Sequence, residues 1–294
     1  MISILIASVN PLLLASLRAN IAETVGVAFE IISIDNGEGK MGLCELYNKA
    51  AAEAKYNFLC FMHEDLSITT NNWGDIVIDN FTNNPKLGLI GVAGSKYKSA
   101  APSTWHCFED EAPELLHYHL IQHYKFSVKE KQLNYSNPAG VKLTKVACVD
   151  GLWFCCTRIA IETYAFDQHL LKGFHGYDLD FSLGIGQHFE VAVTFEILIE
   201  HFSEGNTNKA WLEDILKVHQ KWSDLLPINI AELPKEKILV LEKRGFRNVI
   251  NMMKAEGFTF SQTKAMLMHG KKSRIMTVAL FLKLYLYLFQ KLKD

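Results

Sequence analysis

Residues 43–68 read LCELYNKAAAEAKYNFLCFMHEDLSI, and this stretch carries the clearest structural pattern in the chain. Its first half is rich in Ala and Leu, which is typical of a helix over 43–54. The apolar run 58–62 is typical of a buried strand, and it ends at the polar triplet His63, Glu64 and Asp65. A helix followed by a buried strand with acidic residues at its carboxyl end indicates one repeat of an α/β fold.

The alternation of strands and helices continues on both sides of this stretch. The expected strands are 2–8, 29–34, 87–93 and 191–199, and the expected helices are 12–23, 73–80, 159–164, 177–188 and 211–222. Such alternation forms right-handed βαβ units, so we expect a Rossmann-like, mostly parallel sheet flanked by helices. Ligands bind beyond the carboxyl ends of strands in these sheets, and Asn10, Asp35 and the triplet 63–65 all fall at such ends.

The composition is that of a globular protein. The 294 residues are 49% apolar and 21% charged, with a formal net charge of −2, so neither wholesale disorder nor a nucleic-acid partner is expected. The six cysteines lie mostly in apolar runs without a CxxC pair, which disfavours a zinc knuckle. We expect Cys155 and Cys156 to be core or interface thiols in a reducing cytoplasm. The opening MISILIASVN lacks the basic leader of a signal peptide.

Two regions depart from the α/β pattern. Residues 95–145 are rich in His, Tyr, Lys and Glu with weak periodicity, and we expect an insertion with loops and a hairpin that faces the substrate. Helix formers dominate at the C-terminal end, so the predicted division is a domain over 1–230 and a helical extension over 231–294. The helix expected at 275–292 is too short and interrupted for a membrane span. It either lies in a membrane interface, helped by the basic residues at 271–274, or packs on the domain or across a dimer.

The strand-end acids are the first candidates for chemistry. His63-Glu64-Asp65 offers hard oxygen ligands, which suit Mg²⁺ or Mn²⁺, and a divalent ion there would stabilise a diphosphate leaving group. The alternative for these acids is a helix N-cap or a solvated turn. Asp35, followed by Asn36-Gly37, offers a carboxylate to a nucleobase or ribose, and its alternative is a plain Asx turn.

Further candidates lie in the second half of the chain. Asp178 and Asp180 fall in the first turn of an expected helix and are too close to share one face, so we expect one to face a cleft while the other caps the helix or binds elsewhere. A cleft carboxylate suits a general base for an acceptor hydroxyl, and the alternative is that both acids compensate the helix dipole. His201, directly after the strand at 191–199, is either a metal ligand or a structural histidine.

These motifs, in this order, resemble the GT-A fold glycosyltransferases, and within them the inverting family-two group. ISILIASVNP, IISIDNG and the stretch 43–68 resemble the first strands of that family, with His63-Glu64-Asp65 in the place of its DxD metal motif. VACVDGLWFCCTR resembles its acceptor-side glycine segment. GFHGYDLDFSL, IEHFSEGNTNKAWLED and HQKW resemble a bacterial subgroup with a YDLDF run and a terminal Lys-Trp. The likeness covers residues 1 to 225.

The resemblance implies a role for each matching residue. Asp178 is the expected catalytic base, and Asp65 and His201 are the expected metal ligands. The expected acceptor contacts are Gly151 and Trp153. The expected donor contacts are Ser8, Asn10, Asp35, Asn48 and Glu64.

The implied activity is inverting transfer of a sugar from a nucleotide-diphosphate sugar, with Mn²⁺ or Mg²⁺ as cofactor. The implied acceptor is a glycan or a lipid-linked glycan in bacterial surface polysaccharide synthesis. The alternative, motivated by His in the first position of the metal motif, is a catalytically inactive GT-A domain that binds nucleotide-sugar or glycan. The expected location is the cytoplasm, either free or peripheral on the inner face of the membrane. Both a monomer and a homo-oligomer are compatible with the sequence.

Overall fold

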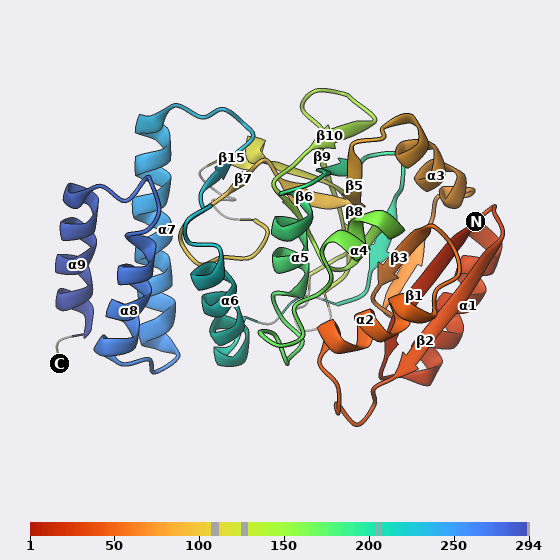
Figure 1. The fold of residues 1–294 in the computed structure, drawn as a ribbon, viewed down its shortest axis with the longest axis horizontal. Coiled ribbons are helices and arrows are strands. Elements are labelled where there is room, and N and C mark those ends of the chain that lie inside the picture. Colours follow the sequence, from red (N-terminus) through yellow and green to blue (C-terminus); the bar gives the residue numbers. More distant parts are fainter. Residues whose placement is uncertain (107–111, 125–128, 204, 206, 293–294) are drawn as a thin grey trace.

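The structure is a computed structural model that describes residues 1–106, 112–124, 129–203, 205 and 207–292. Figure 1 shows an α/β body that contains the N-terminus, with a layer of helices at the opposite end of the molecule. The helices are α1 (Pro11–Thr24), α2 (Leu43–Glu53), α3 (Trp73–Asn83), α4 (Arg158–Thr163), α5 (Tyr177–Ile185), α6 (Lys209–Lys221), α7 (Lys235–Ala255), α8 (Phe260–Gly270) and α9 (Val278–Leu292), with a short 3-10 turn, η1 (Pro113–Leu115).

The central sheet has seven strands in the order β10-β13-β5-β12-β3-β1-β2. Their bounds are β1 (Ile2–Ser8), β2 (Phe29–Asp35), β3 (Phe58–Met62), β5 (Leu87–Gly91), β10 (Leu143–Lys145), β12 (Trp153–Thr157) and β13 (Glu190–Thr194). Strands β1, β2, β3, β5 and β13 run in one direction, while β10 and β12 run against them. The expected mostly parallel sheet is therefore confirmed, with β12 inserted antiparallel between β3 and β5.

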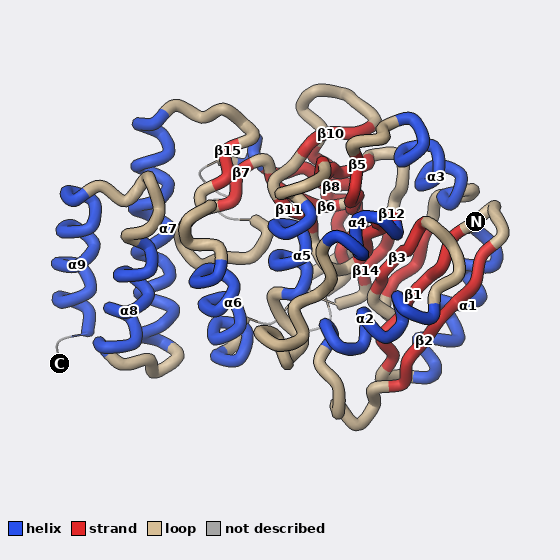
Figure 2. Tube along the Cα trace, in the orientation of Figure 1, coloured by secondary structure: helices blue, strands red, loops and turns tan. Residues whose placement is uncertain are grey.

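Helices cover both faces of this sheet, which explains why its strands are nearly continuous apolar runs. Ile2, Ile4 and Ile6 of β1 point to the face that α1 and α3 cover, and Leu5 points to the face that α2, α4 and α5 cover. Strands β1, β2 and β3, which lie side by side in Figure 2, are parallel, so their carboxyl ends meet at one edge of the sheet. The α/β fold class is confirmed, and this edge holds the predicted strand-end residues.

A second sheet lies beside the central one and brings distant segments together. Its order is β11-β6-β8-β14-β4, with β9 paired to β8. The bounds are β4 (Leu66–Ile68), β6 (Ala93–Ser95), β8 (Leu116–Gln122), β9 (Gln132–Ser136), β11 (Cys148–Val149) and β14 (Ile199–His201). The single strand expected at 191–199 was wrong, because the chain leaves the central sheet after Thr194 and re-enters β structure in the second sheet at Ile199.

The region expected as an insertion contributes mainly to this second sheet. Strands β8 and β9 form an antiparallel pair, from Tyr118 opposite Ser136 to Gln122 opposite Gln132, so the expected hairpin is present. Residues 107–111 and 125–128 of the same region lie outside the described residues. Near the start of the region, β7 (Tyr97–Lys98) pairs with β15 (Ile228–Asn229) in a separate two-stranded sheet.

The three C-terminal helices form a layer of their own. Helix α9 packs on α7 and α8, and their buried residues Phe246, Leu267 and Leu284 belong to the same apolar core as the α5 face of the sheet. The longest helix, α7, had been anticipated only as a region of helix formers and lysines. In the part of the chain that the structure describes, no helix is long and apolar enough to cross a bilayer.

The cysteines of the central sheet are buried, as expected, but they are not all thiols. Cys60 on β3 and Cys155 on β12 are direct partners in the antiparallel register and form a disulfide, with Cα atoms 4.1 Å apart. The expectation of a free thiol was therefore wrong for Cys155. Cys156, whose side chain points to the other face of the strand, stays a buried thiol.

Candidate active site

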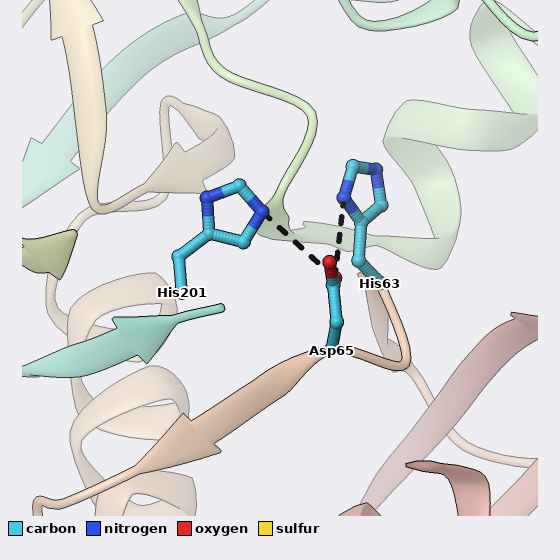
Figure 3. Close-up of side chains that lie close together, drawn as sticks. All are labelled: His63, Asp65 and His201. Carbon is cyan, nitrogen blue, oxygen red and sulfur yellow. Dashed lines mark ion pairs between the residues drawn. The ribbon is translucent and has the colours of Figure 1, made fainter. Parts of the chain in front are cut away.

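Three side chains converge at the edge where β3 ends. His63 and Asp65 lie in the turn between β3 and β4, and His201 ends β14, directly opposite Leu66 of β4. Asp65 Oδ1 is 4.0 Å from His63 Nδ1 and 3.8 Å from His201 Nε2 (Figure 3). One ligand atom from each residue lies within 4.8 Å of the others, so the three could hold one metal ion. The predicted pair Asp65 and His201 is thus brought together, and His63 joins it.

Hydrogen bonds to neighbouring groups leave Asp65 and His201 with one acceptor atom each that faces the triad. The Ser203 hydroxyl donates to Asp65 Oδ2 at 2.6 Å, so the other oxygen faces the two rings. The side-chain amide nitrogen of Gln122 donates to the carbonyls of His123 and Ser203. Its side-chain oxygen therefore accepts a hydrogen bond from His201 Nδ1 at 3.2 Å. This bond fixes the proton on Nδ1 and leaves a lone pair on His201 Nε2.

The imidazole of His201 is held in its neutral form. Burial lowers the pKa of His201. The Asp65 carboxylate opposes this shift, and a positive charge on His63 would reinforce it. A neutral ring is the form that binds a metal ion, so burial and the bond to Gln122 act in the same direction.

His63 is oriented in the same way by Tyr177, the first residue of α5. The Tyr177 hydroxyl donates a hydrogen bond to the Gly151 carbonyl at 3.0 Å. In its 2.8 Å contact with His63 Nε2 it therefore accepts a hydrogen bond from the N–H of the ring. The lone pair of His63 is then on Nδ1, the atom that faces Asp65. Gly151 is required here, because a Cβ at this position would lie 2.3 Å from the Tyr177 hydroxyl oxygen.

A cavity of about 720 Å³ opens beside this triad. His63 and His201 line it, together with Asp150, Gly151 and Asp178. Asp178 is half-buried in its wall and accepts a hydrogen bond from the Gly151 amide at 3.1 Å. Burial, reinforced by the charge of Asp150, raises the pKa of Asp178 to about 7, whereas backbone hydrogen bonds oppose the shift. A carboxyl with such a pKa can take up a proton near neutral pH.

The second aspartate of the YDLDF run points elsewhere. Asp180 is fully buried and accepts from the Tyr164 hydroxyl at 2.9 Å, from Lys221 Nζ at 2.8 Å and from Trp222 Nε1 at 2.8 Å. The two acids therefore face different surroundings, as their spacing predicted. The Lys-Trp pair at the end of α6 is the partner of Asp180, which gives that sequence motif a structural meaning.

Three of the expected donor residues, Ser8, Asn10 and Glu64, lie at the ends of β1 and β3 and are not among the residues that line the cavity. Glu64 is buried and accepts hydrogen bonds from the Ser8 hydroxyl at 2.7 Å and from the backbone amides of Val9 and Asn10. Asn10 caps α1 through its side chain. Glu64 thus organises the loop after β1, and its predicted donor contact and those of Ser8 and Asn10 stay predictions.

The two other donor candidates also have local partners. Asp35 ends β2 with its side chain exposed, and its carboxylate accepts from the Gly37 amide at 2.9 Å, which is the Asx turn named as the alternative. Asn48 on α2 bonds to the backbone of Phe166 and to the Gln168 side chain, so its amide fastens α2 to that loop. Their donor contacts remain predictions.

The two acceptor candidates have different positions. Gly151 lines the cavity, whereas Trp153 is fully buried on the far side of the sheet against Trp73. The strand alternation of β12 explains this burial, since Trp153 points to the face covered by α1 and α3. Aromatic residues that do line the cavity include Trp105, Tyr118 and Trp211.

Sequence reasoning did not find the residues that support the triad. Tyr177 lies in the YDLDF run beside Asp178, so the motif itself carried a signal for it. Ser203 lies in the segment IEHFSEGNTNKAWLED, so that likeness carried a signal for it too. Gln122 had none, because it is one polar residue among many and reaches His201 only through the pairing of β14 with β8.

Comparisons with known proteins agree with this geometry. Residues 13–222 match the model of the glycosyltransferase-like family, which covers more than half of the chain. No curated protein has a significantly similar sequence. The fold is similar to the crystal structure of GalNAc-T7 with UDP, GalNAc and Mn²⁺, with a TM-score of 0.51 and 11% identity over 100% of this chain and 56% of that chain.

A second solved structure has the same fold. S. aureus TarS 1–349 matches with a TM-score of 0.51 and 10% identity, over 98% of this chain and 91% of that one. This chain spans only about half the length of the GalNAc-T7 chain. At these identities the two likenesses concern the fold, which is the expected GT-A arrangement. Together with the family match, they lead to one conclusion: this chain belongs to the glycosyltransferase-like family.

Proposed function

We propose that the protein is an inverting glycosyltransferase that moves a sugar from a nucleotide-diphosphate sugar to a hydroxyl of a glycan or lipid-linked acceptor. The observation that supports this most directly is that Asp178, His63 and His201 line one cavity. A carboxyl with a pKa of about 7 is thereby placed in the same cavity as two imidazoles that both face Asp65. A synthetic role in bacterial surface polysaccharide is part of the proposal.

The reaction that fits these residues is a single displacement. Asp178 takes the proton of the acceptor hydroxyl while that oxygen forms a bond to the anomeric carbon of the donor sugar. The bond from the anomeric carbon to the diphosphate oxygen breaks, and the nucleoside diphosphate leaves with the electron pair. A single attack from the opposite side inverts the configuration at the anomeric carbon. Trp105 on the cavity wall offers an apolar ring face for the acceptor sugar.

A divalent cation fits the triad on the chemistry of its donor atoms. Among the described residues, His63 Nδ1, His201 Nε2 and one oxygen of Asp65 have no other strong partner, and they face one another. Two imidazole nitrogens suit Mn²⁺ better than Mg²⁺, which prefers an all-oxygen shell. When bound, the ion would supply positive charge that stabilises the leaving diphosphate.

The proposal is tested by thermal unfolding with nucleoside diphosphates and metal ions. A ligand that binds only the folded state raises the melting temperature, so Mn²⁺ together with the correct nucleotide should raise it more than Mg²⁺ with the same nucleotide. Asp65→Ala should remove the metal-dependent part of this shift. Asp75→Ala, which removes an exposed acid in the first turn of α3, is the matched control. An unchanged metal-dependent shift in Asp65→Ala would exclude Asp65 as a ligand.

The second candidate is a GT-A domain that binds nucleotide-sugar or glycan without turnover. The observation that favours it is His63 in the first position of the metal motif. The two functions are separated by Mn²⁺-dependent hydrolysis of a panel of nucleotide-sugars. Binding without turnover for each donor and acceptor supports the inactive domain, and release of nucleoside diphosphate supports the transferase.

A further inference from the structure

The outer face of α9 is apolar and exposed. Val278, Leu282 and Leu286 follow one another at intervals of four residues, so they form one stripe along the helix. These three side chains are 77%, 54% and 60% exposed, respectively. The opposite side, Leu280, Leu284 and Leu288, is buried against the rest of the protein. Helix α9 is therefore apolar on two opposite sides, of which one is buried and the other exposed.

The position of α9 leaves this stripe free to meet another surface. Figure 1 shows α9 as the outermost element at one end of the molecule, with α7 and α8 between it and the α/β body. A continuous exposed apolar face is unusual for a soluble monomer and marks a place of contact. The helix is also too short to cross a bilayer.

The charge of this region identifies the kind of surface. Residues 257–292 contain the basic residues Lys264, Lys271, Lys272, Arg274, Lys283 and Lys291, and they contain neither Asp nor Glu. The whole chain has a formal net charge of −2, so this region is positively charged although the protein as a whole is slightly negative. All six side chains are exposed. Three of them directly precede α9, and Lys283 adjoins the stripe.

We propose that the outer face of α9 docks along the surface of an anionic lipid bilayer. The three apolar side chains enter the boundary of the acyl chains, and the exposed basic groups of this region contact the lipid headgroups. A second copy of this chain is a poorer occupant, because a twofold contact between two such faces would bring their basic groups together. This proposal concerns a surface remote from the cavity and does not depend on sugar transfer.

The test is co-sedimentation of the full chain with lipid vesicles, without donor or acceptor. We expect binding to vesicles of equal parts phosphatidylcholine and phosphatidylglycerol, and much weaker binding to phosphatidylcholine alone. Replacing two stripe residues, Leu282→Gln with Leu286→Gln, should weaken binding to the acidic vesicles at least about tenfold. The control, Leu12→Gln with Ile159→Gln, replaces two apolar residues that are as exposed on α1 and α4, and it should bind like the wild type.

A second variant tests the charge by itself. Lys271→Gln, Lys272→Gln and Arg274→Gln together should weaken binding to the acidic vesicles by at least about tenfold and leave the weak binding to neutral vesicles unchanged. The proposal is overturned if the wild type ignores acidic vesicles, or if the stripe variant binds them as well as the control does. It is also overturned if light scattering shows a dimer that the stripe variant converts to a monomer, because a second copy would then cover α9.

Discussion

His63 and His201 are each held by one hydrogen-bond partner that decides which ring nitrogen carries the proton. Tyr177 accepts a hydrogen bond from Nε2 of His63, and Gln122 accepts one from Nδ1 of His201. The free lone pairs consequently sit on opposite nitrogens of the two rings, and both face Asp65. Such outer partners commonly change metal affinity by about 10- to 100-fold when they are removed.

Tyr177→Phe tests this role for one hydroxyl. The ring keeps its packing while His63 loses its acceptor, so we expect Mn²⁺ affinity, measured by calorimetry with a nucleoside diphosphate present, to fall by roughly tenfold. Tyr47→Phe is the matched control, because Tyr47 is a buried neighbour whose hydroxyl has no hydrogen-bond partner among the described residues. Equal Mn²⁺ affinities in both variants would contradict the positioning role of Tyr177.

The raised pKa of Asp178 predicts a pH dependence of transfer. A general base acts only when ionised, so below its pKa of about 7 the rate should fall by about tenfold for each pH unit. The measurement is kcat/KM against pH at saturating metal. Asp178→Asn should abolish transfer and leave binding of the donor nearly intact. A rate that stays flat to about pH 5 would argue against Asp178 as the base.

Helix α5 places two aspartates in opposite electrostatic situations within one turn. Asp178 faces the cavity without a cationic partner in the described structure, whereas Asp180 is bound by Lys221 and Trp222 of the α6 end. A carboxyl whose folded pKa is raised stabilises the fold below its unfolded pKa, and this contribution is lost as the pH rises through the folded value. At alkaline pH the charge of Asp178 is therefore a cost to stability, whereas the Asp180 carboxylate is paired with Lys221.

The same substitution at these two positions should have opposite effects on stability. At about pH 8, Asp178→Asn should leave the melting temperature unchanged or raise it, because a poorly solvated charge is removed. Asp180→Asn should lower the free energy of unfolding by about 2–4 kcal/mol, because Lys221 loses its buried counter-charge. Thermal and denaturant unfolding at that pH measure both changes. A destabilised Asp178→Asn together with an unaffected Asp180→Asn would reverse the assigned roles.

At the scale of the whole molecule, buried hydrogen bonds join the C-terminal helices to the α/β body. Glu242 of α7 is fully buried and accepts from the Tyr97 hydroxyl at 2.5 Å and from the amides of Ala100 and Ala101. His219 of α6 contacts the same segment at Ala100 and Ser103. A few residues further on, Thr104 and Trp105 line the cavity, so these bonds connect the helical layer to the cavity wall.

Removing Glu242 should therefore affect the stability of the whole chain. Glu242→Ala removes the buried carboxylate that accepts from the Tyr97 hydroxyl and the Ala100 amide, and we expect a loss of roughly 2–4 kcal/mol in the free energy of unfolding. Glu236→Ala, an exposed position on the same helix, should change it by no more than about 0.5 kcal/mol. Urea unfolding of both variants decides the matter, and equal stabilities would show that the contact contributes little.

The periodicity of the sequence was sufficient for most of the fold. Strand and helix signals up to residue 93 correspond to β1, α1, β2, α2, β3, α3 and β5, because each is a local pattern of apolar residues. The strand expected at 191–199 failed because its apolar run serves two different sheets. A run of apolar residues reports burial, and it does not report which sheet provides the partner.

The sequence by itself determined the α/β alternation, the strand-end position of His63 and Asp65, and the different environments of Asp178 and Asp180, because these follow from local spacing. Only the tertiary structure decided that His63 joins Asp65 and His201, that Tyr177 and Gln122 orient the two rings, and that Trp153 faces the core. The positions of His201 and Gln122 depend on the pairing of β14 with β4 and β8, across more than a hundred residues in the case of β4, and the direction of Trp153 depends on the pairing of β12 with β3. Long-range pairing places side chains by register, which no local pattern records.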